Sequence, residues 1–431
     1  MTLRYGLIGC GMMGQEHIRN IELLDDTQIT VVFEPDAQMR AQAAKALPNA
    51  TMVDSLDALL AFEAVDCLVI VSPNHCHMAQ LQQIAALRAL PILCEKPLFT
   101  DPADLAQATA FAQSYPAPVW VAMEYRYMPP VAALIEQAEE VTGGIKMLTI
   151  REHRFPFLPK VGDWNRFNHN SGGTLVEKCC HFFDLMRLIL KSDPIRVMAS
   201  AGQEVNHLDE VYAGHRSDIW DCGYVIVDFA SGARAMLELS MFAEGSEYQE
   251  EIHAVGPKGK IACNVPGPAR FWPAHMPYPP VPHVVISPRS PMGPRRIDTP
   301  VPEALLAAGD HNGSTFYQHQ KFQQVVLQGA APEVSLTDGI WAVRMGQAAQ
   351  LSARHGLVKP AREGFALRHG DDGRDARDEG RKVQHARHGH HATGGDFVVV
   401  VKVVGVRTCW GRHARAIQEP TDDEGVFHQQ A

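Results

Sequence analysis

Over the first 125 residues, short apolar runs alternate with segments that have helical periodicity. The apolar runs are Leu3–Ile8, Ile29–Phe33, Cys67–Val71, Ile92–Cys94 and Val119–Met123. Each run is short and continuously apolar, which is typical of parallel strands covered by helices on both faces. The helices expected between them are Gly14–Leu24, Ala37–Ala46, His77–Leu90 and Asp101–Ser114. The pattern predicts an α/β domain with a doubly wound parallel sheet over residues 1–125.

From Gly143 onward, the pattern changes to strand-like segments joined by hairpin turns. The paired segments are Tyr224–Phe229 with Ala235–Phe242, and Glu250–Val255 with Lys260–Asn264. Helical periodicity predicts helices at Thr174–Leu190, Thr315–Leu327 and Thr337–Ala353. The proline-dense stretch 266–302 predicts an irregular loop. Residues 126–360 are therefore expected to form an α+β domain with a mainly antiparallel sheet.

The last segment, residues 361–431, shows neither pattern except for the apolar run Phe397–Val406. It is rich in His, Arg, Asp and Gly, a composition that builds a core poorly and predicts disorder. A frame-shifted or read-through segment would look the same, so a non-native tail is the alternative. The His-rich run at 385–391 has no carboxylate or cysteine framework to fix a coordination geometry, so we expect no dedicated metal site.

Composition and charge narrow the class of protein. Of 431 residues, 46% are apolar and 20% are charged, which is close to the average for globular proteins and suits two domains. The formal charge of −10 leaves no net positive field for a nucleic-acid partner. No apolar stretch approaches the ~18 residues of a membrane span, and no signal peptide precedes the first strand pattern. Nine cysteines without a CxxC pair favour a reducing compartment, so a cytoplasmic location is expected.

A glycine-rich turn joins the first predicted strand to the first predicted helix. Gly9 suits the tight turn, Gly11 lets the backbone approach a pyrophosphate, and Gly14 allows the helix to pack closely on the strand. Met12 and Met13 lie in the same turn and are expected to contact the ligand. The turn therefore predicts a dinucleotide site, with a purely structural turn as the alternative.

An acidic residue, Glu34, ends the second predicted strand about 20 residues after the last glycine. A carboxylate at that position accepts hydrogen bonds from the adenosine ribose and repels a 2′-phosphate. NAD is therefore the expected cofactor, and NADP is disfavoured.

Two polar loops follow the third and fourth predicted strands, at the edge where doubly wound sheets bind ligands. Cofactor contacts are expected there from Ser72, Pro73, Asn74, His77, Glu95 and Lys96. Lys96 is distinctive because a lysine between an acid and a proline has its stem held and its ammonium directed into the crevice. Taken alone, His77 suits a helix-cap residue better than a catalyst.

Three polar residues recur at helical spacing in the segment 172–190. Glu177, His181 and Asp184 are spaced i, i+4 and i+7, so on one continuous helix they share a face. An acid one turn from a histidine can orient the imidazole and raise its basicity, as a general base requires. The candidate catalytic residues are therefore His181 as base, Glu177 as its orienting acid, and Lys96. A polar patch on an interface helix is the alternative.

A crevice for a small polar substrate needs several donors and acceptors, and often an aromatic face for the C–H bonds of the substrate. The residues expected to line such a crevice are Lys96, Tyr125, Arg126, Arg154, Asp163, Trp164, Asn165, Lys178, His181 and His311. For each of them a structural role is the alternative.

Four motifs together resemble the Gfo/Idh/MocA family of NAD(P)-dependent oxidoreductases, which includes glucose-fructose oxidoreductase and inositol dehydrogenases. They are GLIGCGMMGQEH, VSPNHCH, CEKP and GGTLVEKCCHFFDLMR, and the resemblance covers residues 1–360. The family's EKP lysine corresponds to Lys96. Its second hallmark, GGxLxDxGxHxxD, is matched at His181 and Asp184 but has Glu177 in place of Asp and Cys179 in place of Gly.

The resemblance implies an amino-terminal Rossmann domain and a carboxy-terminal domain whose open sheet forms homodimers or homotetramers. It also implies an NAD-dependent dehydrogenase that oxidises a secondary alcohol of a small cyclic polyol or sugar, as an inositol dehydrogenase does. In that reaction His181 removes the hydroxyl proton, Lys96 polarises the oxygen, and hydride passes to nicotinamide. Two alternatives remain: a non-catalytic dinucleotide-binding regulator and an NAD-assisted glycosidase of the same fold. Net formation of NADH separates the three.

Overall fold

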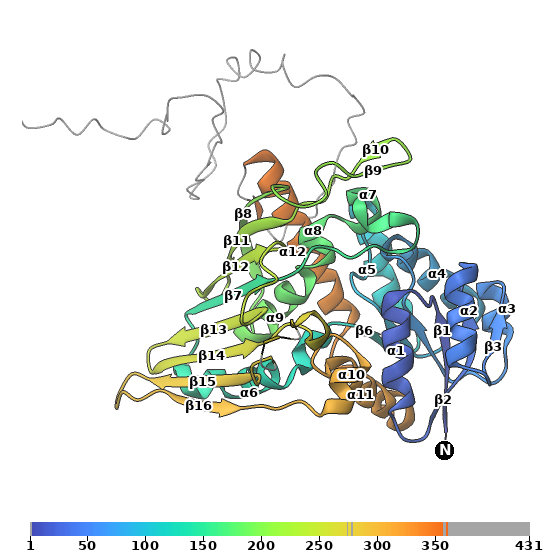
Figure 1. The fold of residues 1–431 in the computed structure, drawn as a ribbon, viewed down its shortest axis with the longest axis horizontal. Helices are drawn as coiled ribbons and strands as arrows, with labels where there is room; N and C mark the ends of the chain where they lie inside the picture. The colour runs from blue at the N-terminus through green and yellow to red at the C-terminus, as the bar shows by residue number, and fades with distance from the viewer. Residues whose placement is uncertain (1, 274, 277–278, 357–358, 361–431) are drawn as a thin grey trace, which may run out of the picture.

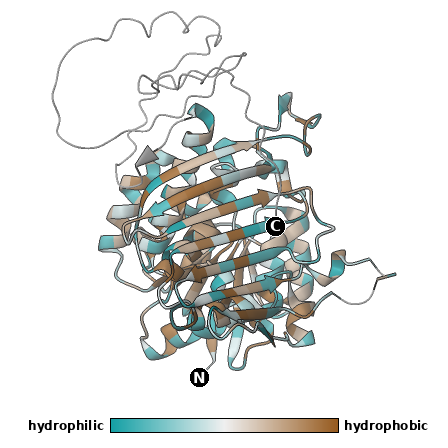
Figure 2. Ribbon diagram, turned by 90° about the vertical axis from the view of Figure 1, so that its left-hand side faces the viewer, coloured by the Kyte–Doolittle hydropathy of each residue, from teal (hydrophilic) through white to brown (hydrophobic). Residues whose placement is uncertain are grey.

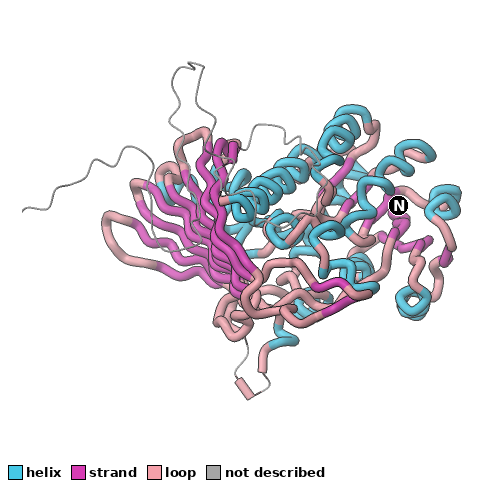
Figure 3. Tube along the Cα trace, turned by 90° about the horizontal axis from the view of Figure 1, so that it is seen from above, coloured by secondary structure: helices cyan, strands magenta, loops and turns pink. Residues whose placement is uncertain are grey.

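A computed structural model describes residues 2–273, 275–276, 279–356 and 359–360. A parallel sheet with its helices occupies one side of the molecule, a larger sheet occupies the other, and helices fill the space between them (Figure 1 and Figure 3). The predicted tail at 361–431, with its apolar run Phe397–Val406 and its His-rich run, lies outside the described residues.

The first sheet is parallel. Its strands are β1 (Leu3–Ile8), β2 (Thr27–Phe33), β3 (Thr51–Val53), β4 (Cys67–Ile70), β5 (Ile92–Cys94) and β6 (Val119–Val121). Their order is β3-β2-β1-β4-β5-β6, so the strand order reverses between β1 and β4. At such a switch point the carboxyl ends of the strands leave a crevice for a ligand. The predicted α/β fold class and its parallel sheet are confirmed.

Helices connect these strands at nearly the predicted positions. They are α1 (Met12–Glu22), α2 (Ala37–Ala46), α3 (Leu56–Ala61), α4 (His77–Leu87) and α5 (Leu105–Ser114), with 3-10 turns η1 (Asn74–Cys76), η2 (Pro102–Asp104) and η3 (Glu124–Tyr127). The sequence analysis missed β3 and α3. Both are too short for their periodicity to stand out, and no residue of β3 is fully buried.

The second sheet is large and mostly antiparallel. Its strands are β7 (Met147–His153), β8 (Pro194–Gly202), β11 (Cys222–Phe229), β12 (Arg234–Ser240), β13 (Glu250–Gly256), β14 (Gly259–Val265), β15 (His283–Pro288), β16 (Arg295–Asp298) and β17 (Lys359–Pro360). Their order is β16-β15-β14-β13-β7-β12-β11-β8-β17, and β7 pairs with β12 in parallel. A separate ribbon pairs β9 (Val211–Tyr212) with β10 (His215–Arg216).

The expectation of an irregular loop over 266–302 is wrong. Strands β15 and β16 lie within this stretch and extend the sheet at one edge. Pro279, Pro280 and Pro282 precede β15, and Pro288 ends it. Because these prolines stand beside or at the end of the strand, they keep it short without removing the amide donors that pair its centre.

The second half of the chain also contains helices α6 (Pro129–Thr142), α7 (Asn168–Ser171), α8 (Thr174–Glu177), α9 (Cys180–Leu190), α10 (Glu303–Ala308), α11 (Ser314–Gln328) and α12 (Leu336–His355), with 3-10 turns η4 (Val161–Arg166) and η5 (Ala269–Phe271). Of these, α6, α9 and α12 pack on one face of the second sheet. Figure 2 shows the other face, where no described helix lies in front of the strands. In the described part of the chain, no helix has both the length and the apolar content needed to cross a membrane.

The single helix expected over Thr174–Leu190 is divided into α8 and α9. The amide of Cys179 reaches the carbonyl oxygen of Thr174, five residues back, at 3.4 Å. A widened turn of this kind interrupts the regular i to i+4 bonding and often lies at a functional site. Glu177 and His181 therefore belong to different helices and do not keep the relation that their spacing predicted.

Helices from the second half of the chain complete the core of the first. Phe322 of α11 and Val343 of α12 belong to the same buried cluster as Trp120 of β6. Gly339 lets α12 approach β6, because a Cβ there would lie only 2.9 Å from Val121 Cγ2. The two sheets are thus held together by shared packing, which fixes the crevice between them.

Candidate active site

The glycine-rich turn has the geometry that a pyrophosphate requires. Gly9 has φ +95°, and a Cβ there would lie 2.8 Å from Ser72 N. A Cβ on Gly14 would lie 2.8 Å from the Gly9 carbonyl oxygen. A Cβ on Gly11, in contrast, would meet no atom within 4 Å, so this backbone faces open space. Helix α1 begins directly after it and directs its amide groups and the positive end of its dipole into that space.

A cavity of about 680 Å³ lies at this turn. Of the predicted cofactor contacts, its lining contains Gly9, Gly11, Met12, Met13, Glu34, Ser72, Pro73, Asn74, Glu95 and Lys96. From the other half of the chain, Lys160 and Trp164 also line it. The volume is that of a small-molecule site, and the open glycine backbone with Glu34 at its edge fits a dinucleotide.

Glu34 ties the glycine turn to the end of β2. Its Oε2 accepts a hydrogen bond from Cys10 N at 2.5 Å, and its Oε1 accepts one from Asp36 N at 2.8 Å. A carboxylate has about four acceptor positions, so these two bonds leave capacity for further donors. The negative charge of Glu34 therefore stands at the cavity wall.

His77 does not line the cofactor cavity. The side chain is fully buried, with Nδ1 2.8 Å from Pro97 O and Nε2 3.1 Å from Ser72 O. It bridges the loop after β4 to the loop after β5, because α4 begins at His77 and turns the imidazole inward. It holds together two loops whose residues line the cavity.

A buried pair of histidines fixes Glu95, and the sequence analysis did not predict this pairing. His17 Nε2 lies 2.9 Å from Glu95 Oε1, and His17 Nδ1 lies 2.7 Å from His319 Nε2. Burial raises the pKa of Glu95 and the hydrogen bond from His17 lowers it, with a net downward shift. Glu95 therefore stays ionised beside Lys96.

Lys96 points from the cofactor cavity toward the segment that carries the other catalytic candidates. Its Nζ donates to the Glu177 carbonyl oxygen at 3.2 Å, and its amide donates to Glu95 Oε2 at 3.1 Å. Burial lowers the pKa of Lys96, but Cys180 and Glu95 raise it, and the net shift is upward. Lys96 is therefore an ammonium group near neutral pH.

His181 is buried next to this ammonium. Its ring stacks on Tyr125, with centroids 4.1 Å apart and planes 8° from parallel. Its Nε2 lies 3.8 Å from Glu124 Oε1, and its Nδ1 has no hydrogen-bond partner among the described residues. Burial, followed by the charges of Lys96 and Lys178, holds the pKa of His181 well below its usual value. His181 is thus a neutral imidazole, the form that a general base needs.

Glu177 contacts a lysine rather than His181. Its Oε1 lies 3.4 Å from Lys160 Nζ, and the acid within ion-pair distance of His181 is Glu124. This corrects the expectation that Glu177 orients the imidazole. The widened turn between α8 and α9 is the physical reason, because it removes the two residues from one helical face.

Glu124 lies in η3, directly after β6. Burial and the neighbouring charge of Glu95 raise the pKa of Glu124 to about 7. Its Oε2 is buried without a hydrogen-bond partner in the described part of the chain. Glu124 therefore changes charge near neutral pH at 3.8 Å from His181.

Behind His181, charged groups from the second sheet surround Tyr125. Lys178 Nζ donates to Tyr125 Oη at 2.5 Å and lies 2.8 Å from Glu152 Oε1. Glu250 is the cross-strand neighbour of Glu152, and burial together with Glu152 raises the pKa of Glu250 to about 7. Arg154 Nη1 lies 3.6 Å from Glu152 Oε1. The predicted residues Tyr125, Lys178 and Arg154 are therefore brought together around His181.

Two predicted substrate contacts have structural roles instead. Arg126 forms a buried bidentate pair with Asp184, in which its Nε donates to Asp184 Oδ2 at 2.6 Å, and its Nη1 donates to Glu333 O at 2.8 Å. Its donors are used in joining η3 to α9. Asn165 is fully buried and donates to Leu158 O at 3.0 Å, which fixes the loop before η4.

The neighbours of Asn165 lie closer to the cofactor cavity. Trp164 lines it, and Lys160 Nζ lies 4.5 Å from the centre of its ring. Asp163 is half-buried and has φ +51°, a conformation that only a few residue types adopt readily. This loop thus presents an aromatic face and a cation to the cavity.

His311 approaches from the loop before α11. Its ring centre lies 6.0 Å from that of Tyr125, and its Nδ1 lies 2.7 Å from Glu16 Oε1 on α1. His311 therefore lies beside Tyr125 and is paired with an acid that the sequence analysis did not select.

Glu124, which the sequence analysis missed, could have been identified from its position in the sequence. Glu124 follows a buried apolar run at the carboxyl edge of the sheet, the same position that drew attention to Glu95. Glu152 and Lys160 offered no such signal, because only the packing of the second sheet and its loop against the first brings them to the site.

Comparison with known proteins gives the family. A model of the oxidoreductase family's NAD-binding Rossmann fold matches residues 3–123, and a model of its C-terminal alpha/beta domain matches residues 134–359. Inositol 2-dehydrogenase of Rhizobium meliloti (strain 1021) is 29% identical over 264 residues, which are 61% of this chain and 76% of that protein. Inositol 2-dehydrogenase of Corynebacterium glutamicum (strain R) is 28% identical over 274 residues, 63% of this chain and 76% of that protein.

Solved structures share the fold. Levoglucosan dehydrogenase in complex with NADH and levoglucosan superposes with a TM-score of 0.70 at 20% identity, covering 84% of this chain and 100% of that one. A myo-inositol dehydrogenase from Corynebacterium glutamicum ATCC 13032 superposes with a TM-score of 0.66 at 21% identity, covering 84% and 99%. The chain belongs to the Gfo/Idh/MocA oxidoreductase family, with an amino-terminal NAD-binding Rossmann fold and a carboxy-terminal α/β domain.

Proposed function

We propose that the protein is an NAD-dependent dehydrogenase that oxidises a secondary alcohol of a cyclic polyol or sugar, or reduces the ketone in reverse. The observation that supports this best is the position of Lys96 and His181 beside the dinucleotide cavity. Lys96 lines the cavity, donates to the Glu177 carbonyl oxygen and acts electrostatically on His181, whose buried Nδ1 has no hydrogen-bond partner among the described residues. Relatives named inositol 2-dehydrogenase support the same class of reaction.

The nicotinamide group supplies the hydride acceptor when it is bound. This chain's part is to hold the dinucleotide and keep water from the reacting carbon. The open backbone at Gly11 and the amino end of α1 receive the pyrophosphate, and Glu34 receives the ribose hydroxyls. Lys160 and Trp164 cover the cavity from the opposite side.

His181 and Lys96 have different roles at the hydroxyl group of the substrate. His181 takes the hydroxyl proton at Nδ1, because burial and the nearby cations keep its imidazole neutral. Lys96 remains an ammonium group and stabilises the negative charge that develops on the oxygen as the proton leaves. Glu124 adjusts the basicity of His181 from 3.8 Å.

Unpaired buried oxygens favour a substrate with several hydroxyl groups. In the described part of the chain, Glu124 Oε2, Glu177 Oε2 and Glu250 Oε2 are buried without hydrogen-bond partners. An unsatisfied buried polar group costs about 1–3 kcal/mol. A polyol or sugar brings the O–H donors that satisfy such oxygens, and an apolar substrate brings none.

NAD is the proposed cofactor in preference to NADP. The Glu34 carboxylate lies at the cavity wall, where it would repel the 2′-phosphate of NADP and accept from the free ribose hydroxyls of NAD. Its bonds to Cys10 N and Asp36 N hold the charge in place.

The open face of the second sheet is the proposed contact between copies, giving a homodimer or homotetramer. Met147, Tyr224 and Ile226 are exposed on it, and Figure 2 shows the strands on this side. Burying apolar side chains of this kind drives association. Light scattering should give a multiple of the chain mass, and Tyr224→Glu with Ile226→Glu should reduce it.

The function is tested by mixing the protein with NAD and a panel of inositols, pyranoses and their methyl glycosides while following NADH absorbance. A dehydrogenase accumulates NADH in proportion to the substrate consumed. A glycosidase that returns its hydride would split the glycosides without net NADH, and a dinucleotide-binding regulator would do neither. Either of the last two results would reject the proposed reaction.

A further inference from the structure

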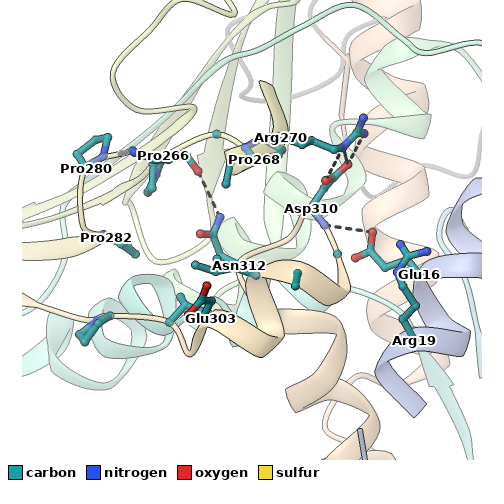
Figure 4. A pocket seen from close by; sticks show the side chains of 18 of the residues that line it. Glu16, Arg19, Pro266, Pro268, Arg270, Pro280, Pro282, Glu303, Asp310 and Asn312 are labelled. Carbon is teal, nitrogen blue, oxygen red and sulfur yellow. Dashed lines mark hydrogen bonds and ion pairs between the residues drawn. The ribbon is translucent and has the colours of Figure 1, made fainter. Parts of the chain in front are cut away.

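Next to the cofactor cavity lies a second cavity of about 840 Å³, shown in Figure 4. Much of its lining consists of proline and aliphatic side chains, including Pro266, Pro280, Pro282, Val301, Leu306 and Ala307. It lies between α1 on one side and the segments around α10 and β15 on the other. The size is that of a small-molecule site, and the mechanism above does not use it.

The polar groups at this cavity are largely paired with one another. Arg270 holds Asp310 in a bidentate pair, with Nε 2.8 Å from Oδ1, and Asn312 donates to Pro266 O at 3.3 Å (Figure 4). The amide of Asp310 donates to Glu16 Oε2 at 3.3 Å. Because these donors and acceptors are occupied, the surface suits an apolar ligand group better than a hydroxyl-rich one.

This cavity adjoins the cofactor site. Met12 and Gln15, on the first turn of α1, line both cavities. The loop 158–161 also divides its residues between them, with Leu158 facing the apolar cavity and Lys160 the cofactor cavity. A molecule in the apolar cavity therefore lies beside the bound dinucleotide.

Side-chain contacts also link the lining of this cavity to the proposed reaction centre. Glu16 lines it and contacts His311 at 2.7 Å. The His311 ring lies 6.0 Å from Tyr125, and Tyr125 stacks on His181 at 4.1 Å. The path from the apolar lining to the proposed base thus crosses two side chains.

We propose that this cavity binds an apolar alkyl or aryl group carried by the substrate, so that the preferred substrate is a glycoside or ether of a polyol rather than the bare polyol. The inference rests on the proposed function, because the polar ring is taken to react at Lys96 and His181. The hydroxyl groups then meet the unpaired carboxylates, and the apolar group meets the prolines and aliphatic side chains. The polar and apolar parts of such a substrate thus each contact a surface of matching polarity.

The test is calorimetric binding of β-D-glucopyranosides with alkyl chains from methyl to hexyl to the full-length protein saturated with NADH. Burying a methylene contributes about 0.8 kcal/mol, so affinity should rise about fourfold per added carbon. Ala307→Trp fills the cavity from an exposed position of α10 and should remove this dependence. Ala304→Trp is the matched control, because Ala304 is exposed on the same helix and does not line the cavity.

Equal affinity for the methyl and hexyl compounds, or no binding of either, would reject the inference. A dependence on chain length that survives Ala307→Trp would place the apolar group elsewhere and reject it too. A change in mass on light scattering with Ala307→Trp alone would instead assign the cavity to a contact between copies. Oxidation of unsubstituted polyols is measured separately, so a failure of the proposed reaction is distinguished from a failure of this site.

Discussion

Glu16 and His311 join the helix of the cofactor turn to the loop before α11. Glu16 Oε1 lies 2.7 Å from His311 Nδ1 and accepts from Thr315 Oγ1 at 3.0 Å. Burial lowers the pKa of His311, but the charge of Glu16 raises it, and together they raise the pKa to about 9. Burial raises the pKa of Glu16, but His311 lowers it, and together they lower the pKa to about 2. The pair is therefore ionised across the neutral range and connects the two halves of the active site.

This pair makes the free energy of unfolding depend on pH. The folded pKa of His311 is above the unfolded value of about 6.5, so its contribution is complete below that pH and is lost as pH rises through about 9. Glu16→Gln should lower the free energy of unfolding by about 2–4 kcal/mol near pH 6, because it leaves His311 without its partner. Urea unfolding should show a smaller difference near pH 10. An equal difference at both pH values would contradict the assignment.

Removing either proposed catalytic side chain should slow turnover without preventing cofactor binding. Lys96→Met and His181→Asn should each lower kcat by about 10²–10⁴-fold, the usual contribution of acid–base groups. The double variant should lose less than the product of the two factors, because both residues act on one proton transfer. NAD should still bind to both variants, as measured by fluorescence quenching, since the pyrophosphate contacts lie at Gly9–Gly14. Near-normal kcat in both single variants would reject the mechanism.

The pH profile should separate the roles of these two residues. Because the pKa of His181 lies well below its usual value, protonation of His181 should cause no loss of kcat/KM in the ordinary histidine range. A decline near pH 7 should come from protonation of Glu124 and be absent in Glu124→Gln. The Lys96 charge contributes to that depression, so Lys96→Met should move the acidic limb to higher pH. The profile of residual activity in Lys96→Met, compared with the unmodified protein, measures this shift. A limb that moves to lower pH would be inconsistent with the pair.

Replacing Glu124 and replacing Glu177 should have different kinetic effects, because the two carboxylates position different side chains. Glu124→Gln removes the carboxylate 3.8 Å from His181 and should lower the basicity of the imidazole, reducing kcat and moving its acidic limb to lower pH. Glu177→Gln removes the partner of Lys160, which lines the cofactor cavity, and should change the KM for NAD more than the pH profile. Steady-state kinetics over a pH series decides between them. A pH shift in Glu177→Gln but not in Glu124→Gln would reverse the assignment.

Cofactor preference should follow the charge of Glu34. Glu34→Gln keeps an acceptor oxygen for Cys10 N but loses the negative charge, so the ratio of kcat/KM for NAD to that for NADP should fall. Glu34→Ser should lower the ratio as well and also weaken NAD binding, because the glycine turn loses its tie to β2. Greater efficiency of the unmodified protein with NADP would show that Glu34 does not select the cofactor.

The sequence determined the features that depend on local order. The short apolar runs identified β1, β2, β4, β5 and β6, because a strand buried on both faces must be apolar at successive positions. The glycine turn, Glu34 and Lys96 were found because each follows directly on such a run, and the carboxyl edge of a parallel sheet gathers whatever follows its strands. That these residues line one cavity could therefore be predicted without knowledge of the second sheet.

Only the tertiary structure decided what surrounds His181. The spacing of Glu177 and His181 assumed an unbroken helix, but a widened turn after Glu177 left the nearby acid to be supplied by Glu124 from another segment. Likewise, the charge of His311 depends on Glu16, which lies 295 residues away in the chain. Proton affinities in a buried site are set by desolvation and by charges within a few ångströms. Those distances follow from how the two sheets pack together, which local sequence patterns do not encode.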